Sequence, residues 1–273
     1  MMVSGNLRKM KSVLASPVAY SLPVGDTRIP LNAVIGQSIV IHYNGRIHCI
    51  ACGRKTNKSF SQGYCFPCMQ KLARCDRCIV SPELCHYDAG TCREPDWAVD
   101  HCLQNHIVYL ANSSGIKVGI TRGTQVPTRW IDQGAGQALP VYQVKDRYLS
   151  GLVEIVFKEH VADRTDWRRM LKGAPELVDL KKVSEALRQA CSARLDAIEQ
   201  RFGEGSIRHL MDVETISINY PVNQYPEKVA SINMDKTPRV EGTLMGIKGQ
   251  YLILDNGVIN IRKYTGYEVS VEL

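Results

Sequence analysis

The sequence predicts an α+β fold, because strand-like and helix-like patterns occupy separate parts of the chain. Short runs of β-branched residues with turn signals fill its start and its end, and one long run with helical spacing precedes the final strands. A block of cysteines interrupts this order. We therefore expect an N-terminal β segment (1–48), a Cys-rich module (49–105), an α/β domain with a long helix (106–205) and a small β-barrel-like domain (206–273).

Local patterns place the elements of the first half. Alternation and turn signals predict short strands at Val18–Val24, Arg28–Gly36 and Gln37–Cys49. Beyond the cysteines, the runs Ile107–Ala111 and Ile116–Thr121 predict a hairpin closed by the turn Asn112–Gly115. Pro127–Gln133 has the start signals of a helix, and Leu152–Val161 fits either a strand or a helix.

The segment from Pro175 to Gly203 predicts the long helix. Its apolar residues recur close to helical spacing, at Leu177, Leu180, Val183, Leu187, Ala190, Leu195 and Ile198. Gly203 is the expected stop, and Cys191 is expected to be a small core residue of this helix. From Thr215 onward, short strands with Lys-Gly and Asp-Asn-Gly turns are typical of a small barrel.

Composition restricts the class of protein. With 44% hydrophobic and 22% charged residues in a chain of 273, we expect a globular fold and not disorder. The apolar runs are too short for a membrane span, and the basic start is followed by an apolar stretch that Ser16 and Pro17 break too early for an export signal. We expect a cytoplasmic protein that does not enter membranes. The formal charge of +7 weakly favours polyanionic partners.

Nine of the ten cysteines lie between residues 49 and 102. Cys49, Cys52, Cys65 and Cys68 form two C-x-x-C pairs separated by 12 residues. Each pair directs two thiolates at one ion, and two pairs complete the tetrahedron that Zn²⁺ accepts. Free thiols or a redox pair are the alternatives. The spacing predicts a structural zinc site, closed to water and substrate.

A second zinc site is expected immediately after the first. Its predicted ligands are Cys75, Cys78, Cys85 and Cys92, and His86, His101 or Cys102 are alternatives for one of them. Only one C-x-x-C pair is present here, so the spacing is less specific than in the first site.

Basic residues are dense around these cysteines, with seven between His42 and Val80 against one acid, Asp76. A zinc ion bound by four thiolates carries a net charge of about −2, which nearby cations offset. Because seven cations exceed this need, we expect Arg54, Lys55 and Lys58 to contact nucleic-acid phosphates. Arg122, directly after the second strand of the predicted hairpin, is a further candidate.

The stretch from Ile107 to Val161 resembles the GIY-YIG endonuclease superfamily in a divergent form. In that family two neighbouring strands carry the name-giving motifs, the following helix supplies an arginine, and a later helix supplies a glutamate. Here Ile107-Val108-Tyr109 looks like the first motif and Lys117-Val118-Gly119 like the second, while Arg129 and Glu154 match the arginine and the glutamate. Lys117 replaces the second tyrosine, and the connection between the motifs is short. The whole chain also resembles an uncharacterised bacterial family, domain of unknown function 2797.

The resemblance implies a catalytic set for phosphodiester cleavage. Glu154 would hold one Mg²⁺ or Mn²⁺ ion, and Arg129 would bind the phosphate through its planar guanidinium. Tyr109 would orient or deprotonate the attacking water, and Lys117 would make loss of that proton easier. Each residue alone also fits a structural role, such as an ion pair between Glu154 and Arg129.

Two functions therefore fit the sequence. The first is a zinc-containing endonuclease that depends on a divalent metal ion. The alternative is a DNA-, RNA- or ribonucleoprotein-binding protein in which the same fold has lost catalysis, and Lys117 in place of the family tyrosine favours it. The terminal strands are compatible with both, because small barrels bind nucleic acids, bind proteins or close a core.

Overall fold

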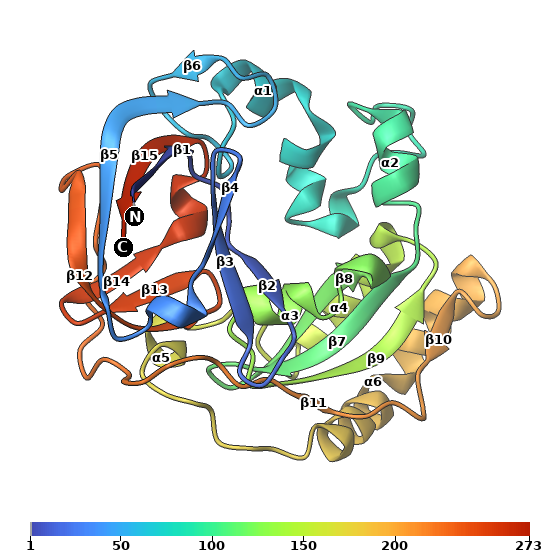
Figure 1. The fold of residues 1–273 in the computed structure, drawn as a ribbon. Helices are drawn as coiled ribbons and strands as arrows, with labels where there is room; N and C mark the ends of the chain where they lie inside the picture. Colours follow the sequence, from blue (N-terminus) through green and yellow to red (C-terminus); the bar gives the residue numbers. More distant parts are fainter. Residues whose placement is uncertain (1) are drawn as a thin grey trace.

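Strands from the two ends of the chain form the largest sheet of the computed structural model, which describes residues 2–273 (Figure 1). This sheet contains β1 (Met2–Asn6), β5 (Ser38–His48), β6 (Lys55–Thr56), β12 (Arg239–Lys248), β13 (Tyr251–Leu254), β14 (Gly257–Asn260) and β15 (Tyr267–Glu272). The main row runs β1-β15-β5-β12-β13-β14, and β6 pairs with β5. All neighbours in it are antiparallel.

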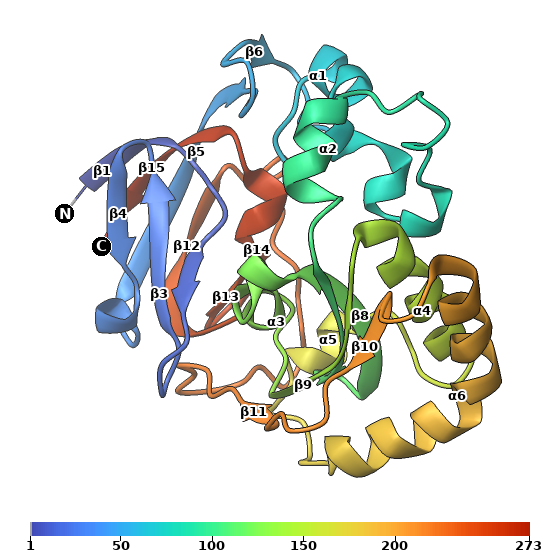
Figure 2. The same ribbon diagram turned by 90° about the vertical axis from the view of Figure 1, so that its right-hand side faces the viewer.

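The predicted C-terminal barrel is wrong. Within residues 2–273 the row ends at β1 and at β14, so the sheet is open. The reason is that β15 pairs with β1 and β5, and β12 pairs with β5, so N-terminal strands take positions between and beside the C-terminal ones. The expected turns are present, since Gly249, with φ of +62°, turns β12 into β13. Figure 2 shows the two chain ends side by side at this sheet.

The second sheet contains the predicted hairpin. Its strands are β7 (His106–Asn112), β8 (Ile116–Arg122), β9 (Gln137–Val144), β10 (Ile207–His209) and β11 (Ile216–Ser217). The row runs β10-β9-β7-β8, with β11 also on β9. β7 and β8 are antiparallel and place Tyr109 opposite Gly119. The hairpin prediction is therefore confirmed, with β8 as an edge strand.

A third sheet of β2 (Lys11–Val13), β3 (Ala19–Val24) and β4 (Thr27–Pro30) lies between the other two (Figure 1). The strands predicted at Val18–Val24 and Arg28–Gly36 correspond to β3 and to β4, although the second prediction runs past the strand into a 3₁₀ turn.

The helices are α1 (Phe66–Lys71), α2 (Pro95–His101), α3 (Thr128–Asp132), α4 (Arg147–Lys158), α5 (Trp167–Met170) and α6 (Leu180–Phe202). Short 3₁₀ helices are η1 (Asn32–Val34), η2 (Ala73–Cys75), η3 (Arg77–Ile79), η4 (Pro82–Leu84), η5 (Gly123–Gln125) and η6 (Ile261–Tyr264). Leu152–Val161, for which strand and helix both stayed open, belongs mainly to α4. Asp146 caps α4 by accepting from the Leu149 N–H, and α6 ends at Gly203, with φ of +96°, as expected.

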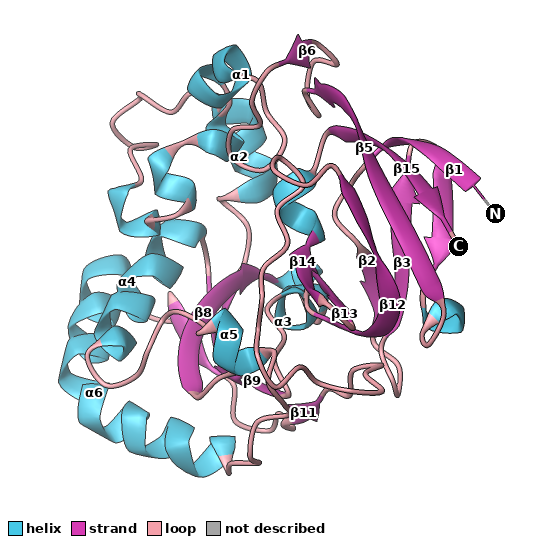
Figure 3. Ribbon diagram, turned by 90° about the vertical axis from the view of Figure 1, so that its left-hand side faces the viewer, coloured by secondary structure: helices cyan, strands magenta, loops and turns pink. Residues whose placement is uncertain are grey.

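The second sheet separates two apolar cores. On one face α4 and α6 pack against it, and Val108, Leu110 and Cys191 are buried there (Figure 2). On the other face Tyr109 packs with Trp130 in a core that includes the first and third sheets. The cysteine-rich segment, made of short helices and loops, lies at one end of the molecule, near the tip of β5 and above α4 (Figure 3). In residues 2–273, no helix combines the length and apolar composition of a membrane span.

Candidate functional site

The first cysteine group is gathered as predicted. The sulfur atoms of Cys49, Cys52, Cys65 and Cys68 all lie within 4.8 Å of one another. Burial raises the pKa of the Cys49 thiol, but backbone N–H groups that donate to its sulfur outweigh this and lower the pKa to about 6. A thiolate among three further thiols fits the tetrahedral coordination of zinc. The group can hold a structural metal ion such as zinc.

The second predicted ligand set is not brought together. Cys78, Cys85 and Cys92 line one small cavity, but Cys75 does not line it. The side chain of Cys75 instead interacts with Ser61, on the side of the first group. The cause is local: η2 ends at Cys75, and Asp76 starts a new turn by accepting a 2.6 Å hydrogen bond from the Arg77 N–H. The two thiols of this C-x-x-C pair therefore face different surroundings.

Three of the predicted phosphate-binding residues lie on the surface beside the first cysteine group. Arg54, Lys55 and Lys58 are exposed, and the Lys58 ammonium lies 5.4 Å from the ring centroid of Phe60. None of the three forms an ion pair in the described part of the chain. Their charges are available for a partner. Arg122 lies elsewhere, in a pocket of about 550 Å³ at the far end of β8.

Tyr109 is completely buried in the middle of β7. Its hydroxyl donates to Gln133 Oε1 at 3.0 Å and also interacts with the Arg129 side chain. A β-carbon on Gly119 would lie 2.7 Å from the Tyr109 hydroxyl oxygen, so only glycine leaves room for this ring. Burial raises the pKa of Tyr109 to about 12. The glycine of the Lys117-Val118-Gly119 motif is therefore needed for the Tyr109 ring to fit against β8.

Lys117 lies on the same face of the hairpin as Tyr109, because side chains alternate along a strand and Lys117 is two residues from Gly119. Only 4% of the residue is exposed. Burial, assisted by the charge of Arg129, lowers the pKa of Lys117 to about 8, and the charge of Glu154 opposes this. Arg129 and Glu154 are therefore both within electrostatic range of Lys117.

Glu154 lies on α4, which packs on the opposite face of the sheet from Tyr109. Its charge nevertheless acts on both Tyr109 and Lys117. Two features make this possible: β8 is an edge strand, and Ala162, just beyond α4, pairs with Lys117 along that edge. The charges of Arg129 and Glu154 thus act on both Tyr109 and Lys117, although Glu154 and Tyr109 lie on opposite faces of the sheet and do not converge on one face as expected.

Glu154 does not pair with Arg129. Burial raises the pKa of its carboxyl, and the nearest cation is the Lys158 ammonium, 3.7 Å from Oε2. Lys158 also lies 3.2 Å from a carboxylate oxygen of Asp163. One lysine therefore stands between two carboxylates, a donor set that also suits Mg²⁺, which takes one or two protein carboxylates and retains waters.

Two further cations were not found from the sequence. Arg147 and Arg262 are largely buried, which lowers the pKa of both guanidinium groups, and the charge of Arg129 acts on each. Arg147 lies two helical turns before Glu154, a spacing that would have identified it had α4 been predicted firmly. Arg262 comes from η6 near the C-terminus, and no local signal connects it to the hairpin.

The family of the chain follows from a match over most of its length. A family model described as a protein of unknown function (DUF2797) matches residues 36–269. The chain belongs to this family. No curated protein and no solved structure matches it. The matched residues include the first cysteine group. They also include Tyr109, Lys117, Arg129 and Glu154.

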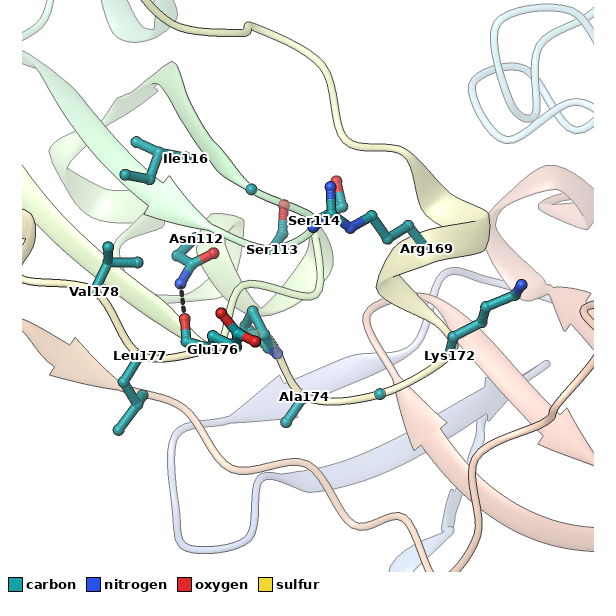
Figure 4. Close-up of a pocket in the computed structure, with 13 residues that line it drawn as sticks. Asn112, Ser113, Ser114, Ile116, Arg169, Lys172, Ala174, Glu176, Leu177 and Val178 are labelled. Atoms are coloured by element: carbon teal, nitrogen blue, oxygen red, sulfur yellow. Dashed lines mark hydrogen bonds between the residues drawn. The ribbon is translucent and has the colours of Figure 1, made fainter.

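A separate pocket of about 480 Å³ opens beside the hairpin turn of this DUF2797 chain (Figure 4). Its walls include the turn itself and the segment with Arg169 and Lys172. Asn112 donates to the Glu176 carbonyl at 2.7 Å, and the Ser113 hydroxyl lies 3.1 Å from that of Thr165. These polar groups hold the turn in place. This pocket is not lined by Tyr109, Lys117, Arg129 or Glu154.

Helix α3, which carries Arg129, is held by a buried carboxylate. Asp132 pairs with Lys9 at 2.8 Å and accepts from Gln250 Nε2 at 2.8 Å. Gln250 in turn exchanges hydrogen bonds with the backbone of Met10. Both the N-terminal strands and the C-terminal sheet thus fix the helix that presents Arg129 to Tyr109.

Proposed function

We propose that this DUF2797 protein binds nucleic acid and cleaves phosphodiester bonds with the help of a divalent metal ion, Mg²⁺ or Mn²⁺. The observation that carries the proposal is that Tyr109 and Lys117 share one face of the hairpin and that the charges of Arg129 and Glu154 act on both. They occur on strand, strand, helix and helix, in the order that the GIY-YIG resemblance implies. A half-buried carboxylate near a buried lysine and a half-buried arginine suits a site for a metal ion and a phosphate.

Each group has a role that follows from its surroundings. Glu154, with Asp163 nearby, would hold the divalent ion after Lys158 moves aside. Such an ion would offset the charge that develops on the phosphate and make a bound water more acidic. Arg129, supported by Arg147 and Arg262, would bind the phosphate oxygens, since guanidinium groups donate in a planar fork.

Lys117 is better suited than Tyr109 to accept the proton of the attacking water. With a pKa near 12, Tyr109 remains a neutral phenol whose buried hydroxyl donates to Gln133 and would position Arg129. Lys117 has a pKa near 8, so a useful fraction is neutral at mildly alkaline pH and accepts a proton. This assignment would allow a chain without the second family tyrosine to cleave phosphodiester bonds.

Replacing Lys117 with arginine and with methionine tests this role. Arginine keeps the positive charge but does not accept a proton, because its pKa is above 12. We expect both variants to lose about a hundredfold or more in cleavage rate, in the range that general bases contribute. Single-turnover rates measure this effect. If Lys117→Arg cleaves as fast as wild type, Lys117 acts only through its charge.

The exposed cations near the first cysteine group supply a surface for the nucleic-acid backbone. We expect binding to weaken steeply with salt, because each neutralised phosphate releases counterions. The triple variant Arg54→Ala/Lys55→Ala/Lys58→Ala should bind more weakly and with a shallower salt slope, by about one unit for each phosphate that it no longer neutralises. Fluorescence titrations at several salt concentrations measure both. An unchanged slope would indicate that these residues only offset the charge of the metal group.

The function itself is tested by incubating the pure protein with single- and double-stranded DNA and RNA. We expect cleavage of at least one substrate with Mg²⁺ or Mn²⁺ and none after a chelator selective for these ions is added. Intact substrates under all metal conditions, together with tight binding, would reject the nuclease and support the second candidate.

That second candidate is a binding protein without catalysis. One observation favours it: Lys158 already lies between Glu154 and Asp163, so the position proposed for the metal ion has a cation of its own. The same cations would then recognise structured nucleic acid or a ribonucleoprotein.

A further inference from the structure

A small cavity in the cysteine-rich module is lined by four cysteines, of which three belong to the second predicted ligand set and the fourth was an alternative in it. They are Cys78, Cys85, Cys92 and Cys102, and the cavity measures about 20 Å³. The remaining walls are mainly apolar or aromatic side chains, including Ile79, Trp97 and Ala98.

The four thiols come from four different places in the chain. Cys78 lies in η3, Cys85 follows η4, Cys92 precedes α2, and Cys102 is the cap residue at the end of α2. The thiol of Cys102 lies within electrostatic range of those of Cys85 and Cys92. Chain segments with little regular structure are thus folded so that these four cysteines line one cavity. A small enclosed space surrounded by soft ligands is suited to zinc, which joins such segments in proteins without a large core.

We propose that Cys78, Cys85, Cys92 and Cys102 bind a second structural zinc ion, with Cys75 outside the site. This differs from the spacing prediction in one ligand, and Cys102 takes the place of Cys75. It does not rest on the proposed nuclease function.

Arg147 supplies an independent argument. A zinc ion with four thiolates carries about −2 net charge, and a buried site needs a nearby cation to offset it. The Arg147 guanidinium donates to the Ile79 carbonyl, next to Cys78, and the Arg147 backbone N–H donates to the Cys102 carbonyl at 2.8 Å. The same side chain acts electrostatically on Glu154. The second zinc site would therefore anchor the first turn of α4, the helix that carries Glu154.

Two other donors compete for this position. Asp76 and His86 place ligand atoms within 4.8 Å of each other and of Cys78. Both are already occupied: Asp76 pairs with Arg93 at 2.7 Å, and the His86 ring lies 2.8 Å from the Thr91 hydroxyl. The four thiols need no such bonds to be broken, but their sulfur atoms are not gathered as closely as those of the first group, so zinc would have to draw them together.

The metal content of matched variants tests the ligand set. Protein purified without chelator should contain about two zinc ions per chain by elemental analysis. We expect Cys75→Ser and His86→Gln to retain about two, and Cys102→Ser to retain about one. A wild-type value near one, a loss of metal in Cys75→Ser, or full metal in Cys102→Ser would overturn the proposal.

If Cys102→Ser does not fold, a measurement on the wild-type protein still tests the proposed ligand set. Zinc is exchanged for cadmium-113, whose resonance frequency reports how many sulfur atoms coordinate it. Two resonances typical of four-sulfur coordination are expected. A single such resonance, or a second one typical of nitrogen or oxygen ligands, would contradict the assignment. Neither experiment involves nucleic acid, so its result is independent of the nuclease test.

Discussion

Glu154→Gln is expected to reduce metal-dependent cleavage by about a thousandfold or more, since metal ligands act mainly on the charged transition state. The substitution keeps the shape of a half-buried side chain but removes the charge that would hold Mg²⁺. Nucleic-acid affinity should remain within about threefold of wild type, because the exposed cations and the arginine group supply most of the binding. Single-turnover cleavage and equilibrium titration measure the two effects separately.

The matched control is Glu159→Gln on the same helix. Glu159 caps the end of α4, is exposed and pairs with Arg194 on α6. The Glu159→Gln variant should cleave nucleic acid at the wild-type rate. If Glu154→Gln loses binding and thermal stability together with cleavage, Glu154 supports the fold through Lys158 and not the reaction.

Cys49→Ser is expected to release the first metal ion and to destabilise the protein severely. Cys49 directly follows β5 and is buried, and the residues after it turn back so that its N–H donates to the Arg54 carbonyl. Because ligand binding and folding are coupled at structural zinc sites, we expect a loss of more than about 3 kcal/mol in the free energy of unfolding. Thermal unfolding and elemental analysis on the same sample provide the two readings.

Cys191→Ala is the control for loss of a thiol. Cys191 is buried on α6, away from the metal groups, with its thiol directed at the Val156 carbonyl. This variant should keep all its metal and lose only about 1 kcal/mol, as expected for a small change in a packed core. A Cys49→Ser protein as stable as Cys191→Ala would mean that the first cysteine group does not support the fold.

The elements predicted well are those whose signals lie within a few residues. The hairpin follows from alternation and from its turn, and the end of α6 follows from Gly203. The barrel was wrong because pairing depends on partners far away in sequence. Tyr267 opposite Ile47, and Val3 opposite Val271, are pairings that no local pattern reveals.

The candidate site shows the same limit. The spacing of the first two C-x-x-C pairs was sufficient to predict the first cysteine group, because the two cysteines of each pair share one turn. The same spacing did not predict that Cys75 and Cys78 have different surroundings, which arise because Asp76 between them begins a new turn. Arg262 could not be found at all, because only the packing of the C-terminal segment against α3 brings it near Arg129.

Glu154 carries the proposed function only if it forms part of a site for a divalent metal ion beside Tyr109 and Lys117. Titration of the zinc-containing protein with Mn²⁺, followed by the electron paramagnetic resonance of the free ion, tests this without any assay of cleavage. We expect about one additional Mn²⁺ per chain in the wild type and in Glu159→Gln, and none in Glu154→Gln. Equal Mn²⁺ binding by all three proteins, or none in the wild type, would contradict the metal site.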